Sequence, residues 1–146
     1  MTYPDNGTSS SAATGAALLR LALGTMWISH AMLKLLVFTM PGTAAFFESQ
    51  GLPGFLAYPL VVAELLGGAA IVLGFHGRQA SLLLAPVLAV VVCVHFPNGW
   101  VFTAANGGWE YPLFLMVASV AHGLIGDGRW ALRPSALLPA PRMAKA

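Results

Sequence analysis

Residues 55–75 read FLAYPLVVAELLGGAAIVLGF, and this stretch decides the fold class. It is long enough to cross a bilayer, because a membrane-spanning helix needs about 20 apolar residues. Its one charged side chain is Glu64. A helix formed here would have no continuous polar face to turn toward water. The stretch therefore predicts a transmembrane helix rather than a surface helix of a water-soluble domain.

Three further apolar runs share this character and cover residues 16–39, 79–96 and 109–125. Turn-forming residues separate the four runs, among them Pro41-Gly42, His76-Gly77-Arg78 and Pro97-Asn98-Gly99. The first loop also contains Phe46, Phe47 and Glu48, which favour a short interfacial helix. We expect an all-α integral membrane four-helix bundle over residues 16–132. Residues 1–15 are expected to form a disordered polar tail, and residues 133–146 a loose tail rich in Pro and Ala.

The composition supports a membrane protein and excludes several function classes. Hydrophobic residues make up 58% of the 146-residue chain and charged residues 8%, whereas a soluble domain carries about 25% charge. A net charge of +2 is too small to indicate nucleic-acid binding, so the expected partner is the lipid bilayer. Cys93 is the single cysteine, which excludes an intramolecular disulfide and a CxxC redox centre.

The distribution of basic residues predicts the orientation. Cytoplasmic loops of membrane proteins carry an excess of Lys and Arg. The first and third loops have none, whereas basic residues flank the start of the first run, the second loop and the end of the fourth run: Arg20, Arg78, Arg129, Arg133, Arg142 and Lys145. Both termini are therefore expected to be cytoplasmic.

Ionisable residues inside the predicted spans are candidates for function, because a charge in the membrane is costly. With a rise of about 1.5 Å per residue, five of them reach a similar depth in the outer half of the bundle. This predicted layer consists of His30, Lys34, Glu64, His95 and Glu110. We expect it to bind a small ligand, with apolar walls from Trp27, Phe55 and Tyr58.

Structural roles are the alternative for several of these residues. Lys34 and Glu64 are also explained by a buried ion pair that fixes the helix register. Arg20 fits a snorkelling or pairing residue near the inner interface. His122 fits a hydrogen-bonded interior histidine rather than a ligand. His30 and His95 could ligate a haem between helices, for which two lone histidines are a weak signal. No spacing typical of a metal site is present, so no metal is expected.

The chain also resembles a known family. The stretch from Gly51 through Glu64 to Gly67-Gly68, continued by Leu73-Gly74-Phe75 and Arg78, is similar to the DoxX family of small bacterial membrane proteins. Leu19-Arg20, Gly24 and Lys34 also fit, as does the closing segment 126–132. The resemblance implies a four-helix protein of the bacterial inner membrane. It also implies an association with redox systems, since relatives include the membrane subunit of a thiosulfate:quinone oxidoreductase.

These observations favour a membrane redox subunit that binds a quinone or a small sulfur anion in the outer layer. Lys34 would contact a quinone carbonyl or an anion, and Glu64 or Glu110 would move protons. The chain has no electron carrier of its own, so we expect a partner subunit or a homo-oligomer. A non-catalytic anchor or assembly subunit is the main alternative, and a small transporter is a third. The sequence does not decide whether the chain is itself part of an enzyme.

Overall fold

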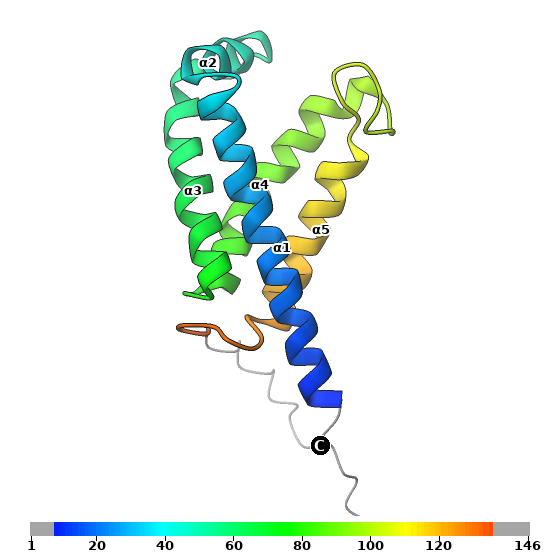
Figure 1. Ribbon diagram of the computed structural model, residues 1–146. Helices are drawn as coiled ribbons and strands as arrows, with labels where there is room; N and C mark the ends of the chain where they lie inside the picture. The colour runs from blue at the N-terminus through cyan, green and yellow to red at the C-terminus, as the bar shows by residue number, and fades with distance from the viewer. Residues whose placement is uncertain (1–7, 136–146) are drawn as a thin grey trace, which may run out of the picture.

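The computed structural model describes residues 8–135, and this part of the chain is helical (Figure 1). Its only β-type pairing is an isolated bridge between Phe75 and Arg133. The elements follow in the order α1 (Thr8–Leu36), α2 (Met40–Ser49), η1 (Gly54–Leu56), α3 (Ala57–Leu73), α4 (Gly77–His95), η2 (Phe96–Asn98) and α5 (Glu110–Ile125). The four predicted helices are present as α1, α3, α4 and α5, and the short helix in the first loop is present as α2.

Within the described part of the chain, three helical segments are long and apolar enough to cross a membrane: Ser10–Leu36, Gly54–Leu73 and Gly77–Asn98. The helix α5 is apolar but shorter, with 16 residues. These lengths and compositions indicate a multi-pass membrane protein.

The first helix begins earlier than its sequence indicates. We expected a polar tail up to residue 15, but α1 already starts at Thr8. Contacts with the C-terminal segment explain the difference: the backbone N–H of Arg129 donates to the Ala13 carbonyl, and its guanidinium donates to the Ser10 hydroxyl, both at 3.1 Å. The expected tails at residues 1–7 and 136–146 lie outside the described residues. Residues 133–135 are bonded to the bundle, and His76 N–H donates to the Arg133 carbonyl at 3.0 Å.

Small residues allow α1 and α3 to pack closely. A Cβ atom on Gly24 would lie 2.5 Å from Cγ2 of Val72 and 2.8 Å from the carbonyl oxygen of Gly68. A Cβ atom on Gly68 would in turn lie 3.0 Å from Cβ of Trp27. The two helices therefore cross closely one turn from Glu64, since small residues let membrane helices come together.

The helices form two pairs, α1 with α3 and α4 with α5 (Figure 1). The pairs meet at the end where α1 begins, where the α3–α4 turn lies and where residues 126–135 cross the bundle; we call this the tail end. They diverge toward the end that carries α2 and the α4–α5 loop, which we call the loop end (Figure 1). Two groups of polar residues lie at these opposite ends.

Candidate functional site

Lys34 and Glu64 form an ion pair between α1 and α3. The Lys34 ammonium lies 2.7 Å from both carboxylate oxygens of Glu64. The Glu64 side chain is 3% exposed and the Lys34 side chain 20% exposed. The predicted proximity of these two residues is therefore confirmed. The Glu64 carboxylate offsets the charge of this ammonium, which weakens its attraction for another anion.

His30 links α1 to α5. One ring nitrogen, Nδ1, lies 3.0 Å from the Met26 carbonyl oxygen in the preceding turn. The ring stacks on Tyr111, with ring centroids 6.3 Å apart and planes inclined by 27°. The Tyr111 hydroxyl donates to the sulfur of Met26. These contacts give His30 a packing partner on the helix that begins with Glu110.

His95 and Glu110 shape the α4–α5 loop. Nδ1 of His95 lies 3.0 Å from the Asn106 carbonyl oxygen. The Glu110 carboxylate accepts a hydrogen bond from the Phe102 backbone N–H at 2.9 Å. Among the described residues, no hydrogen bond or ion pair joins His95 or Glu110 to the Lys34–Glu64 pair. The predicted polar layer is thus divided between an α1–α3 ion pair and a structured loop.

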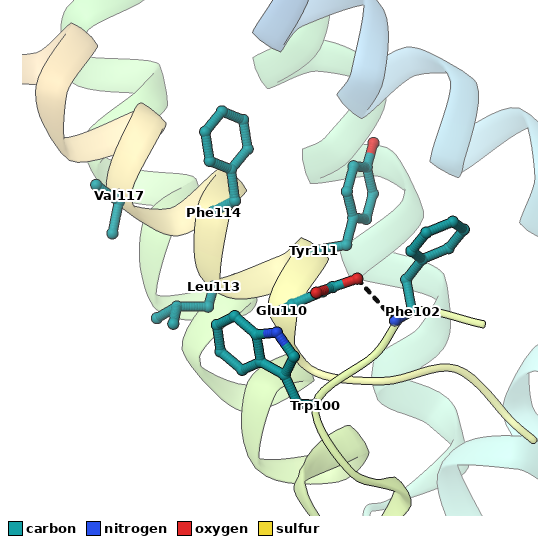
Figure 2. A pocket seen from close by; sticks show the side chains of 7 residues that line it. All are labelled: Trp100, Phe102, Glu110, Tyr111, Leu113, Phe114 and Val117. Carbon is teal, nitrogen blue, oxygen red and sulfur yellow. Dashed lines mark hydrogen bonds between the residues drawn. The ribbon is translucent and has the colours of Figure 1, made fainter. Parts of the chain in front are cut away.

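A pocket of about 470 Å³ lies where this loop meets α5 (Figure 2). Seven residues line it: Trp100, Phe102, Glu110, Tyr111, Leu113, Phe114 and Val117. The carboxylate of Glu110 points toward the Phe102 N–H, between the side chains of Trp100 and Phe102 (Figure 2). Apart from this carboxylate and the polar tips of Trp100 and Tyr111, the lining is apolar. Its volume falls in the range of small-molecule sites, and four of its seven lining side chains are more than half exposed, so it is a shallow depression of the surface.

Glu110 is the one predicted site residue in this lining. The expected walls lie elsewhere: Trp27 is buried in the core, whereas Phe55 and Tyr58 are 70% and 51% exposed. The wall is formed instead by Trp100 and Phe102 of the loop and by residues of α5. Trp100 packs edge-to-face on Trp109 with ring centroids 4.4 Å apart. The density of aromatic residues around Glu110 was the available signal, but it also fits an aromatic belt at the membrane surface.

A second groove, of about 400 Å³, continues along α5 from the same residue Val117. It lies between α4 and α5 and is lined by Leu82, Ala85, Pro86, Ala89, Met116, Val117 and Val120. Every lining residue is apolar. An apolar groove on a membrane helix pair can accept a hydrocarbon chain, either from a lipid or from a ligand.

Another polar group lies at the tail end and was largely missed from the sequence. Arg20 donates to the carbonyl of Asp127 at 3.0 Å, and the backbone N–H of Arg78 donates to its carboxylate at 2.9 Å. His122 shares a 2.8 Å hydrogen bond with Ser81, which confirms the expectation of a hydrogen-bonded interior histidine. Arg20 is a pairing residue, as expected, although its partners are backbone carbonyls.

The fold and these sites define a small, all-helical, multi-pass membrane protein with polar groups held between its helices. The DoxX family matches residues 15–97, and the chain belongs to this family. A relative from Bacillus subtilis (strain 168), described as "Putative oxidoreductase CatD", is 31% identical over 121 residues, which are 82% of this chain and 85% of the relative. No solved structure matches. The family match ends before the α4–α5 loop, so it includes Lys34 and Glu64 but not the pocket around Glu110.

Proposed function

We propose that the protein is a membrane-embedded subunit of a redox system and that it binds a quinone head group in the pocket around Glu110. The family and the name of the Bacillus relative support the redox association. The observation that supports a quinone ligand is the position of the Glu110 carboxylate. It is held by the Phe102 N–H on the wall of an aromatic pocket.

The lining suits a flat, weakly polar ring. Aromatic side chains bind planar groups through stacked or edge-to-face contacts. Trp100, Phe102 and Phe114 are 51%, 64% and 68% exposed, so the pocket is open to its surroundings. A quinone could enter directly from the bilayer. The apolar groove that shares Val117 could hold part of its tail.

Glu110 provides the proton chemistry in this proposal. Quinone reduction consumes protons as well as electrons, and a partner subunit would supply the electrons. Glu110 is the carboxyl group on the pocket wall, so it is the side chain placed to pass protons between water at the membrane surface and a quinone carbonyl. Lys34 is not required for this role, because Glu64 already holds its ammonium.

A small sulfur anion fits this pocket less well than a quinone does. The lining contains one carboxylate and no cationic side chain. An anion would therefore find no charge partner in the lining. Lys34, the cation expected to bind such an anion, already has its charge offset by Glu64.

The membrane arrangement is also part of the proposal: α1, α3, α4 and α5 all span, with both termini cytoplasmic. The positions of Arg78, Arg129 and Arg133 support it, since all three lie at the tail end. The helix α5 is about 24 Å long at 1.5 Å per residue, so Trp109 and the preceding loop would lie in the interface. The pocket would then face the outer leaflet.

A quinone titration tests the ligand. Purified protein in nanodiscs is titrated with decylubiquinone, and binding is followed by quenching of tryptophan fluorescence, to which Trp100 contributes. Glu110→Leu replaces the carboxyl with an apolar side chain of similar size, and should weaken binding about tenfold, as expected for one lost hydrogen bond. Glu48→Leu, the same change on exposed α2, is the control. Equal affinities for all three proteins would contradict the proposed role of Glu110.

A non-catalytic assembly subunit is the second candidate, and a specific observation favours it. Lys34, Glu64, His95 and Glu110 all have intramolecular partners, as in a self-satisfied structural network. On this account a partner protein would co-purify in mild detergent, and the Glu110→Gln variant would retain both that partner and the activity of the complex. Loss of activity with the complex intact would favour the quinone site.

A further inference from the structure

The polar group at the tail end is nearly sealed from solvent. It combines residues of three helices and of the segment that follows α5, and we call it the tail-end cluster: Arg20, Arg78, Ser119, His122 and Asp127. These residues are between 0% and 5% exposed. The segment 126–135 crosses this end of the bundle beside the starts of α1 and α4 (Figure 1).

The single carboxylate of the cluster is occupied by backbone groups. One oxygen of Asp127 accepts from the Arg78 N–H at 2.9 Å, and the other accepts from the Ser135 N–H at 2.7 Å. Nε2 of His122 lies 3.7 Å from the first oxygen, beyond hydrogen-bond distance. The carboxylate therefore serves mainly to hold the chain turn after α5.

The two guanidinium groups have carbonyl partners instead of a carboxylate. Arg20 donates to the carbonyls of Asp127 and Trp130, and Arg78 donates to the carbonyls of Gly123 and Leu124. Within residues 8–135, neither guanidinium forms an ion pair. Arginine remains protonated in proteins, so two positive charges stand against one negative charge. A buried excess charge of this kind is costly unless it is balanced.

Four buried polar atoms in this cluster have no hydrogen-bond partner among the described residues: Arg20 Nε, Arg78 Nη1, Ser119 Oγ and His122 Nε2. Buried polar atoms are nearly always hydrogen-bonded, so each unsatisfied one requires an explanation. The two arginine nitrogens can only donate, and a serine hydroxyl can donate as well. The cluster lacks an acceptor, and it lacks negative charge.

We propose that the tail-end cluster binds a small inorganic anion such as chloride. One such ion would accept hydrogen bonds from Arg20, Arg78 and Ser119 and would offset the excess positive charge. Buried water could satisfy these donors, but it would leave the charge unbalanced. Because every side chain of the cluster is buried, a compact ion fits better than a bulky one. The site is separate from the Glu110 pocket and does not depend on quinone binding.

The test measures thermal unfolding of the purified protein in phosphatidylcholine nanodiscs. Chloride replaces gluconate at constant ionic strength, so that only the identity of the anion changes. An ion that binds the native state raises the unfolding midpoint, and the rise saturates as the site fills. We expect a saturable rise with chloride and also with bromide. Equal midpoints in chloride and gluconate would overturn the proposal.

Ser119→Ala is the decisive variant, because it removes an unpartnered hydroxyl and none of the hydrogen bonds described above. We expect it to require several-fold more chloride for the same rise. Arg129→Gln is the control, since it removes a positive charge from an exposed position of the same segment. An unchanged chloride response in Ser119→Ala would contradict the site, as would a loss of response in Arg129→Gln.

A direct binding measurement removes the dependence on variants. Radioactive chloride should bind to the protein in phosphatidylcholine nanodiscs and should be displaced by unlabelled bromide. A lipid phosphate has the same negative charge, so the measurement is repeated with phosphatidylglycerol present. Stabilisation by phosphatidylglycerol without any chloride binding would show that a lipid phosphate offsets the positive charge of the cluster, and it would overturn a small-anion site.

Discussion

The Lys34 ammonium lies 2.7 Å from each carboxylate oxygen of Glu64, and this pair joins α1 to α3 next to their closest approach. The carboxylate is almost fully buried, whereas the ammonium retains some exposure. Removal of one partner leaves the other charge, or a strongly polar group, inside the bundle. The pair therefore makes the α1–α3 contact sensitive to single substitutions and more tolerant of matched ones.

Lys34→Met should lower the free energy of unfolding by about 3 kcal/mol, because it leaves the buried Glu64 carboxylate without its partner. The double variant Lys34→Met with Glu64→Gln should be more stable than Lys34→Met alone. Reversible unfolding in detergent micelles measures these two variants and Glu64→Gln alone. Glu48→Gln on α2 controls for the loss of a carboxylate. If the losses of the two single variants simply add in the double variant, the two side chains are not coupled.

Gly24→Ala should destabilise the protein by about 1–3 kcal/mol, since the new methyl group would overlap Val72 and the backbone of α3. Gly15→Ala is a matched control in the same helix, because no atom lies within 4 Å of its added Cβ. Gly15→Ala should be neutral or stabilising by up to about 1 kcal/mol, as Ala favours a helix over Gly. Equal unfolding midpoints for the two variants would contradict the close α1–α3 crossing.

Ser81→Ala should cost about 1–2 kcal/mol, because it removes the buried hydrogen bond to His122 and leaves a ring nitrogen without a partner. Ser49→Ala removes an exposed hydroxyl that bonds to the Phe46 carbonyl and should be almost neutral. Thermal unfolding in the same detergent compares the two serines. A smaller loss of stability for Ser81→Ala than for Ser49→Ala would show that the hydrogen bond to His122 contributes little to stability.

We expect the C-terminus to lie in the cytoplasm, so of two reporters fused to it only the one that works in the cytoplasm should be active. The basic residues at the tail end favour this side of the membrane. Fusions to a fluorescent protein that folds in the cytoplasm and to a phosphatase that is active outside report the two possibilities. Insertion of the same reporters in the α4–α5 loop, between Ala104 and Asn106, should give the opposite pattern. Phosphatase activity from the C-terminal fusion alone would reverse the proposed orientation.

The sequence predicted the helices because their apolar runs are long enough to cross a membrane. It predicted the Lys34–Glu64 pair because the two residues lie at matching depth in the predicted spans. It placed the start of α1 too late, since the polar residues from Thr8 onward are helical through contacts with a segment more than 100 residues away in the chain. Local composition does not reveal such contacts.

The pocket walls could not be predicted in the same way. The expected walls were Trp27, Phe55 and Tyr58, but the observed walls come from α5 itself and from Trp100 and Phe102 of the loop that precedes it. Loop conformation depends on turn geometry and on specific bonds, such as that from the Phe102 N–H to Glu110, which spacing does not determine. Asp127 was missed for a similar reason, because its partners are backbone groups of distant residues.

Photolabelling with an azido-quinone tests the central claim most directly. Protein in nanodiscs is illuminated with the probe, and the labelled peptides are mapped by mass spectrometry. The proposed site predicts label within residues 100–117, displaced by unmodified quinone and reduced in Glu110→Leu but not in Glu48→Leu. Label that unmodified quinone does not displace, or label confined to the helices around Lys34 and Glu64, would contradict the assignment of the quinone to the Glu110 pocket.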